Sequence, residues 1–312
     1  MVDLTISLVT ADNEKLILDC LRSIYENTQG LKLETYVVIN ASSDDSEESI
    51  KKEFPQAKLI INDKKLGFTH NHNMVMRKGR GKYFLVLNDD TVIINGALRK
   101  MVDYMDVSGK VGVLGCKIMK ADKSLERSCG TAITHKYEFF KTGVLQAFFP
   151  FLPKKHFSTT TEVTWVTGAC LMVRAQATQE VGLFDENIVI YFEDGDLCYR
   201  MNKAGWKVVF YPEAEIIHYH GQTRKKHLAR DLFIIYQSRL YFFTKHYYGL
   251  TLLIVRLFTI MEVSLRYVKI SLPFFHSSEY RTQAKSIRET YKRVIWMALI
   301  PSSTSFKGGS QQ

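Results

Sequence analysis

Short apolar runs and helix-like segments alternate along the first third of the chain. The apolar runs predict strands at residues 4–9, 35–39, 58–61 and 83–87. Segments whose apolar residues recur three and four positions apart predict helices at residues 13–27, 46–53 and 69–78. Strands that alternate with helices are typical of a mostly parallel sheet covered by helices on both faces. The pattern therefore predicts an α/β domain of the Rossmann-like kind.

The run at residues 83–87 leads directly into three polar side chains, Asn88, Asp89 and Asp90. Five continuous apolar and aromatic residues indicate a strand that is buried on both faces. Ligands of such sheets bind at the carboxyl ends of the strands. Two adjacent carboxylates there repel each other, and a divalent cation that carries a phosphate would compensate them. The alternative is a solvated turn, because Asn and Asp are also common in turns.

The middle of the chain continues the sheet less regularly. We expect helices at 96–106 and 175–181, and strands at 111–114, 165–173, 207–212 and 215–221. Residues 117–162 lack clear periodicity, which is typical of a functional loop or lid. Within the strand at 165–173, Gly168 would let the backbone come close to a ligand.

Three acids, Glu193, Asp194 and Asp196, crowd into four positions after an aromatic pair. Asp196 and Arg200 lie four residues apart on the following helix, so we expect them to form a structural ion pair. Glu193 and Asp194 come at the start of that helix, where its dipole favours an ionised carboxylate. A carboxylate in this setting is a candidate general base.

Several other polar residues allow either a binding or a structural role. The loop at residues 40–46 could bond a ribose or phosphate, or cap the next helix. Gly67 forms a turn before a helix that carries His72, for which a structural or solvent-facing role is expected. His218 and His220 alternate onto one face of their strand, so one or both could complete a metal site with the carboxylates near residue 90.

Composition is that of an ordinary globular protein with 46% hydrophobic residues in 312. The five cysteines are scattered without a Cys-x-x-Cys pair, so neither a disulfide framework nor a zinc site is expected. No secretory signal is recognised at the amino end, and a cytoplasmic location is expected.

Charge is concentrated at the carboxyl end. Residues 222–312 hold 15 Lys and Arg against 4 Asp and Glu, whereas the rest of the chain is nearly neutral. Such a basic region indicates an anionic partner, either nucleic acid or a lipid surface. Residues 302–312 are expected to form a disordered tail.

The apolar segment at residues 250–272 decides between these partners. Its polar residues fall on one helical face: Arg256, Thr259, Glu262, Arg266 and Lys269. Charges along its whole length argue against a membrane span, and no nucleic-acid module is recognisable. We expect an interfacial helix whose cations attract an anionic membrane, a dimer contact, or ordinary packing on the rest of the protein.

Five motifs in this order carry a family resemblance: residues 88–91, 165–170, 182–185, 191–198 and 217–221. Together they resemble the family 2 glycosyltransferases with the GT-A fold, and most closely the bacterial rhamnosyltransferase-like group that builds surface polysaccharides. The resemblance covers about residues 4–245. It implies a nucleotide-sugar donor, a divalent cation (Mn²⁺ or Mg²⁺), and inversion at the anomeric carbon by single displacement.

The resemblance also implies roles for individual residues. Asp194 matches the catalytic base, with Glu193 as the acid beside it, and Asp90 and His218 match the metal-binding or diphosphate-binding positions. Donor binding would involve Thr10, Asn13, Asn40, Ser42, Gly67, Asn88, Asp89 and Gly168. Ile39 departs from the family, which usually has an acidic residue there to hold the donor's base, so the donor is left open.

The sequence thus predicts a catalytic GT-A domain at residues 1–222, a basic helical region at 223–301 and a tail at 302–312. The resemblance favours dTDP-rhamnose among the possible donors, and the expected enzyme acts on a lipid-linked or oligosaccharide acceptor at the inner face of a bacterial membrane. A homodimer through the carboxyl-terminal helices is a further expectation, and a nucleic-acid partner is not. Two alternatives are a degenerate transferase that serves as a scaffold and a two-carboxylate glycoside hydrolase.

Overall fold

The computed structural model describes residues 1–130, 157–219, 228–272 and 278–300. The chain divides into two compact units. We call the first the sheet unit; it comprises Met1–Ala132, Lys155–Glu186 and Glu193–His220. The remainder, called the helical unit, includes the described segments 187–192, 228–272 and 278–300. The predicted tail at 302–312 and His220 lie outside the described residues.

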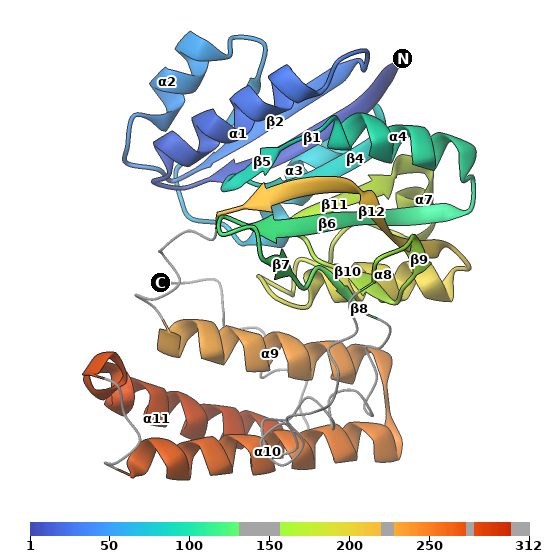
Figure 1. Cartoon of the computed structure of the whole chain (residues 1–312). Coiled ribbons are helices and arrows are strands. Elements are labelled where there is room, and N and C mark those ends of the chain that lie inside the picture. The colour runs from blue at the N-terminus through green and yellow to red at the C-terminus, as the bar shows by residue number, and fades with distance from the viewer. Residues whose placement is uncertain (131–156, 220–227, 273–277, 301–312) are drawn as a thin grey trace. The chain divides into compact units, whose positions relative to one another are not determined.

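A mixed, mostly parallel sheet forms the centre of the sheet unit (Figure 1). Its strands run in the order β3-β2-β1-β4-β11-β6-β12-β5. Their bounds are β1 Val2–Thr10, β2 Leu33–Asn40, β3 Lys58–Asn62, β4 Gly81–Asn88, β5 Thr91–Ile93, β6 Val111–Lys120, β11 Cys170–Arg174 and β12 Lys207–His218. Strand β11 runs antiparallel to both β4 and β6, and the short β5 runs antiparallel to β12.

Four two-residue strands complete the unit. In the large sheet β7 (Leu125–Glu126) pairs with β6 and β9 (Thr161–Glu162) pairs with β12, while β8 (Cys129–Gly130) and β10 (Trp165–Val166) pair with each other. The predicted α/β architecture with helices on both faces is confirmed.

Each face of the sheet is covered by its own helices. Helices α1 (Glu14–Asn27), α2 (Ser46–Glu53) and α4 (Ala97–Val107) contribute to one apolar core, and α3 (Phe68–Lys78), α7 (Ala175–Val181) and α8 (Glu193–Lys203) pack on the opposite face. Strand β4 serves both cores, because Leu85 and Leu87 join the first whereas Phe84 and Val86 join the second. This two-sided burial explains the unbroken apolar run that precedes Asn88.

Three predicted strands are divided differently in the structure. The strand expected at 165–173 is split into β10 and β11, which belong to different sheets and are separated by Thr167–Ala169. The strands expected at 207–212 and 215–221 form the single strand β12, whose register shifts between Tyr211 and Glu215. Pro212 falls in this irregularity, where the missing backbone N–H is tolerated. Of the irregular region 117–162, residues 131–156 lie outside the described chain.

The helical unit contains α9 (Leu228–His246), α10 (Gly249–Ser271) and α11 (Ser278–Leu299). These helices share an apolar core that includes Tyr236, Leu240, Val263, Ile287 and Val294. Among the described residues, none of the helices combines the length and the apolar character needed to cross a membrane.

Candidate active site

Most of the site residues predicted from the sequence lie together at the carboxyl ends of the parallel strands, which we call the carboxyl edge of the sheet. Thr10, Asn40 and Asn88 end the neighbouring parallel strands β1, β2 and β4, so they lie at the same edge. His218 ends β12 opposite Thr91. Gly168 reaches the same place just before β11, because the Asn88 amide donates to the carbonyl of the next residue, Ala169, at 3.1 Å.

The loops after β1 and β2 are joined by hydrogen bonds. The Asp12 amide donates to Ser42 Oγ at 2.6 Å, and the Ser43 amide donates to Asp12 Oδ1 at 2.7 Å. Ser42 Oγ itself donates to Asp44 Oδ1 at 2.8 Å. Asp12 and Ala41 have φ values of 58° and 52°, in the left-handed region that non-glycine residues rarely occupy. The two loops therefore form one preorganised wall, in which the Ser42 hydroxyl is a structural element.

Asn40 fixes the loop that contains Gly67. Its Oδ1 accepts a hydrogen bond from the Leu66 amide at 2.9 Å, and its Nδ2 donates to the Leu66 carbonyl at 3.1 Å. Gly67 follows as the residue before helix α3, with φ of −69°. The Asn40 amide thus acts on protein backbone, and its contribution to a donor site would be to position this loop.

Asp89 lies between the ends of β1 and β4. Asn13 precedes helix α1 without forming a side-chain cap, and its Nδ2 instead donates to Asp89 Oδ2 at 3.2 Å. Burial and the charge of Asp90 raise the pKa of Asp89 to about 6, although the hydrogen bond from Asn13 opposes the rise. A carboxylate with this pKa gains from any cation or hydrogen-bond donor that a ligand brings.

Asp90, His218 and Glu126 form a chain of polar groups in which His218 is buried and the two carboxylates are partly buried. His218 Nε2 lies 3.0 Å from Asp90 Oδ1, and its Nδ1 lies 3.1 Å from Glu126 Oε2. Burial alone would lower the pKa of His218, but hydrogen bonds to these two carboxylates and their charges outweigh it and raise the pKa to about 9. Asn88 Nδ2 also lies 3.4 Å from His218 Nε2.

This chain has the donor set of a partly formed cation site. No cluster of three or more His, Cys, Asp or Glu side chains able to hold a metal occurs in the described part of the chain. Asp90 Oδ1 and His218 Nε2 lie next to each other, however, and Glu126 contacts the other ring nitrogen, as carboxylates commonly do for histidines that bind metals. Mg²⁺ is often bound by one or two protein ligands and completed by phosphates. The residues fit a divalent ion whose remaining ligands come from a diphosphate.

Asp194 and Glu193 have contrasting surroundings at the start of α8. Asp194 Oδ2 accepts from the Gly168 amide at 3.0 Å and its Oδ1 accepts from the Gly195 amide at 2.6 Å, which stabilises an ionised carboxylate. Glu193 is only 6% exposed, and its Oε2 has no hydrogen-bond partner within the described part of the chain. Burial and the charge of Asp194 raise the pKa of Glu193 well above its usual range.

The backbone just before these acids is strained. Tyr191 and Phe192 have φ values of 66° and 68°, and both are bulky residues for which the left-handed region is unfavourable. Each such residue costs on the order of 1–3 kcal/mol, and such strain is often found at functional sites. The tight turn brings the chain into α8 with the two acids in its first turn.

Two polar residues near the site have structural roles. Asp196 Oδ2 accepts from Arg200 Nε at 2.8 Å, as predicted, and Arg200 also donates to the Leu183 carbonyl. His72 is 1% exposed and its Nδ1 lies 2.7 Å from Ser7 Oγ. Burial lowers the pKa of His72 to about 3, so it is neutral in the folded protein.

Sequence reasoning did not single out Glu126. It lies in the irregular region after β6, and β7 brings it to the site by pairing Glu126 with Ile118. The only indication in the sequence is that Glu126 follows closely after the apolar run that forms β6.

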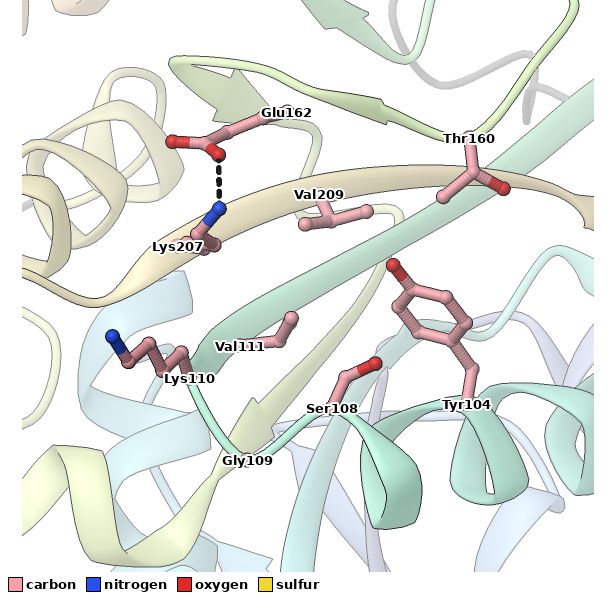
Figure 2. Close-up of a pocket in the computed structure, with 9 residues that line it drawn as sticks. All are labelled: Tyr104, Ser108, Gly109, Lys110, Val111, Thr160, Glu162, Lys207 and Val209. Carbon is pink, nitrogen blue, oxygen red and sulfur yellow. Dashed lines mark ion pairs between the residues drawn. The ribbon is translucent and has the colours of Figure 1, made fainter.

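A separate cavity of about 450 Å³ lies at the opposite edge of the sheet (Figure 2). It is lined by residues at the amino ends of β6 and β12, among them Val111 and Lys207. Lys207 Nζ forms an ion pair with Glu162 at 2.8 Å on its wall. It contains none of the site residues predicted from the sequence.

Solved structures of glycosyltransferases share this fold. The chain aligns with the mannosyltransferase PcManGT from Pyrobaculum calidifontis, solved with GDP-Man and Mn²⁺, over 95% of its own length and 86% of that chain, with a TM-score of 0.57 at 14% identity. GalNAc-T7, solved with UDP, GalNAc and Mn²⁺, aligns over 95% of this chain and 56% of that one, with a TM-score of 0.60 at 12% identity. These likenesses establish the GT-A fold.

The family follows from the sequence. Residues 3–233 match the family described as "Glycosyltransferase like family 2", and since this is most of the chain, the protein belongs to that family and is a glycosyltransferase. It is 26% identical to the N-acetylglucosaminyl-diphospho-decaprenol L-rhamnosyltransferase of Mycobacterium tuberculosis over 231 residues. This aligned region covers 67% of this chain and 74% of that protein. Rhamnosyltransferase WbbL of Escherichia coli is 28% identical over 175 residues, 51% of this chain and 63% of that protein. The resemblance to the bacterial rhamnosyltransferase-like group is confirmed.

Proposed function

We propose that the protein is an inverting glycosyltransferase in which Asp194 is the general base. The observation that supports this most is the contrast between two adjacent acids at one helix start. Asp194 accepts hydrogen bonds from two backbone N–H groups, which favour its ionised form, whereas burial and the charge of Asp194 raise the pKa of Glu193. Adjacent carboxyl groups with different protonation are a common basis for acid and base roles. Asp194 takes the proton of the acceptor hydroxyl while that oxygen bonds to the anomeric carbon and the bond to the donor phosphate breaks.

Asp90 and His218 are proposed to hold a divalent cation, Mn²⁺ or Mg²⁺. When bound, such an ion neutralises charge on the departing nucleoside diphosphate. Glu126 keeps the His218 ring in position from its other nitrogen. Thr10, Asn13 and Asp89 form the adjoining wall at the ends of β1 and β4, which we assign to the donor's ribose or sugar.

The names of two relatives support a proposal for the donor and the acceptor. Both named rhamnosyltransferases favour a rhamnose donor, for which we propose dTDP-rhamnose, and the mycobacterial name favours a lipid-diphosphate-linked acceptor in surface polysaccharide synthesis. Ile39 is 3% exposed and belongs to the apolar core, so it offers no polar group to the base. Recognition of the nucleobase would then fall to other groups of the walls that Asn40 and Ser42 hold in place.

An acceptor carried on a lipid requires the enzyme to work at a membrane. We therefore place the protein in the cytoplasm, peripheral to the inner face of the cell membrane. The basic composition of residues 222–312 supports this location.

The cation assignment is tested by the substitution Asp90→Ala. Removing a hard oxygen ligand should weaken binding of a nucleoside diphosphate by roughly tenfold or more in the presence of Mn²⁺, measured by titration calorimetry. EDTA should weaken binding to the wild-type protein to a similar extent. Asp122→Ala, at an exposed acid in the turn after β6, is the matched control and should bind as wild type. Equal affinity of Asp90→Ala and wild type, with and without EDTA, would contradict the assignment.

Binding and turnover measurements distinguish the proposed enzyme from the two alternatives. A glycoside hydrolase needs no nucleotide, so tight nucleoside diphosphate binding argues against it. A degenerate scaffold would bind without turnover, so release of nucleoside diphosphate from dTDP-rhamnose in the presence of an acceptor argues against that.

A further inference from the structure

Helix α10 exposes a continuous apolar stripe along its whole length. Its members recur three or four residues apart and are 38 to 71% exposed: Leu250, Leu253, Leu257, Met261, Leu265, Val268 and Leu272 just beyond the helix end. We call this set the α10 stripe. Two more exposed apolar residues, Trp296 and Leu299, lie near the end of α11. Arg256 of α10 donates to the Ala298 and Ile300 carbonyls, which places that end of α11 beside α10.

The polar side of α10 faces the interior of the helical unit. Arg256, Thr259 and Glu262 are 8%, 0% and 6% exposed. Glu262 Oε2 pairs with Arg239 Nη1 of α9 at 2.9 Å, and its Oε1 accepts from Arg266 Nε at 3.1 Å. Arg256 Nη1 lies 2.7 Å from the Ile300 carbonyl.

This orientation is the reverse of that in a water-facing amphipathic helix, where the apolar side turns inward. The single polar face predicted from the sequence exists, but its central members hold the helical unit together. The expectation that Arg256 attracts an anionic membrane is therefore wrong, because its guanidinium is buried and bonded to backbone carbonyls.

The charges that remain at the surface of α10 are cationic. Arg266 and Lys269 are exposed near the carboxyl end of the stripe, whereas Glu262, the only acid of this helix, is buried. A strip of leucines bordered by Lys and Arg without carboxylates matches the apolar and anionic layers of a phospholipid surface. A second copy packed against the same face would bring the cations of two α10 helices together, and α10 exposes no acid to pair with them.

We propose that the α10 stripe lies in the interfacial layer of an anionic bilayer, with the helix parallel to the membrane plane. The inference rests on the proposed peripheral location and names the surface responsible for it. Since most of the contact is apolar, salt should weaken the attachment only partly, because screening acts on the cations alone. A protein held by its charges alone would be released at 1 M salt.

The test compares two matched sets of exposed residues in the full chain. Leu253→Ser with Leu257→Ser and Leu265→Ser removes the middle of the stripe, and Ile61→Ser with Val107→Ser removes exposed apolar residues of the sheet unit. Co-sedimentation with phosphatidylglycerol–phosphatidylethanolamine vesicles should show roughly tenfold or greater loss of affinity for the stripe variant and none for the control. Wild type should remain largely bound in 1 M NaCl.

A site-specific probe distinguishes lipid from a second copy. The five native cysteines are buried, so Leu257→Cys supplies the accessible thiol for an environment-sensitive dye. A blue shift with vesicles, quenched by brominated lipid, supports the proposal. A shift that depends on protein concentration without lipid, together with a dimer that the stripe variant loses, would overturn it in favour of an interface between copies.

Donor binding separates this inference from the proposed function. The stripe variant should bind nucleoside diphosphate with Mn²⁺ as wild type does, which shows that its sheet unit is folded. A far-UV circular dichroism spectrum equal to that of wild type shows that the helical unit is folded as well. If that variant still binds vesicles as wild type does, the α10 assignment is wrong while the enzyme assignment stands. If wild type binds no nucleotide, the proposed function fails whatever the vesicles show.

Discussion

Two neighbouring side chains, Glu193 and Asp194, show how surroundings give the same chemical group different roles. Asp194 receives the Gly168 and Gly195 amides, which are fixed donors that stabilise negative charge. Glu193 packs beside the same glycine, where a Cβ at Gly168 would lie 3.7 Å from its Oε1 and 3.3 Å from the Phe68 ring. Its burial among such groups favours the neutral form.

His72 supplies a test of the pH dependence of stability. Its pKa is about 3 when folded and 6.5 when exposed, so below pH 6.5 the unfolded chain binds a proton that the folded protein does not. This group should therefore lower the free energy of unfolding by about 1.4 kcal/mol per pH unit as the pH falls from 6.5 toward 3.

The substitution His72→Asn removes this titration. The variant should be less stable than wild type at pH 7, because it loses packing against Phe68 and Phe184. At pH 5 the difference in free energy of unfolding between the two proteins should be smaller by about 2 kcal/mol. Urea unfolding at both pH values measures it. A difference that stays constant would show that His72 is protonated in the folded state as well.

Residues whose partners are close in sequence were predictable. The Asp196–Arg200 pair follows from a spacing of four on one helix, and it forms at 2.8 Å. Glu126 was not predictable, because its partner His218 is 92 positions away and only the pairing of β6 with β7 and β12 brings them together. Sequence spacing cannot report such a contact.

At the scale of elements, the helical unit depends on one buried carboxylate. Glu262 pairs with Arg239, which is 6% exposed, and it also accepts a hydrogen bond from Tyr236 at 3.1 Å. Glu262→Leu should destabilise the helical unit by about 3–5 kcal/mol, since it leaves a buried guanidinium without this acid. Thermal unfolding followed by circular dichroism measures the loss.

The paired substitution Glu262→Leu with Arg239→Met is the control. Replacing both charges by apolar groups of similar volume should restore much of the lost stability. A double variant as unstable as Glu262→Leu would show that packing, and not the ion pair, is responsible.

The sequence predicted most elements of the sheet unit, because the spacing of apolar residues along a strand or a helix is a local property of the sequence. Helices α2 and α7 begin and end where the pattern placed them. The pattern could not show that β11 enters the sheet antiparallel between β4 and β6, since pairing is decided by distant residues. For α10, periodicity revealed two faces but not which one is inside, because that depends on Arg239 and on the end of α11.

At the scale of the whole molecule, the donor can be identified without the acceptor. A ligand that binds only the folded state raises the unfolding midpoint, and a concentration of 100 times Kd adds about 2.7 kcal/mol. In a thermal-shift screen of nucleotide sugars with Mn²⁺, dTDP-rhamnose should give the largest rise, and Asp90→Ala should remove about half of it or more. A larger rise with another nucleotide sugar would overturn the proposed donor and leave the class of enzyme intact.

The central claim is that Asp194 accepts the proton and that Glu193 does not. It is tested most directly by single-turnover rates for Asp194→Asn and Glu193→Gln, each with saturating donor whose binding is verified by calorimetry. Asp194→Asn keeps the shape of the side chain but cannot take the proton, so its rate should fall by about 10²- to 10⁴-fold with donor affinity unchanged. Glu193→Gln replaces a buried neutral acid by a neutral amide and should remain within about tenfold of wild type. A deeper loss in Glu193→Gln than in Asp194→Asn would contradict the assignment of the base.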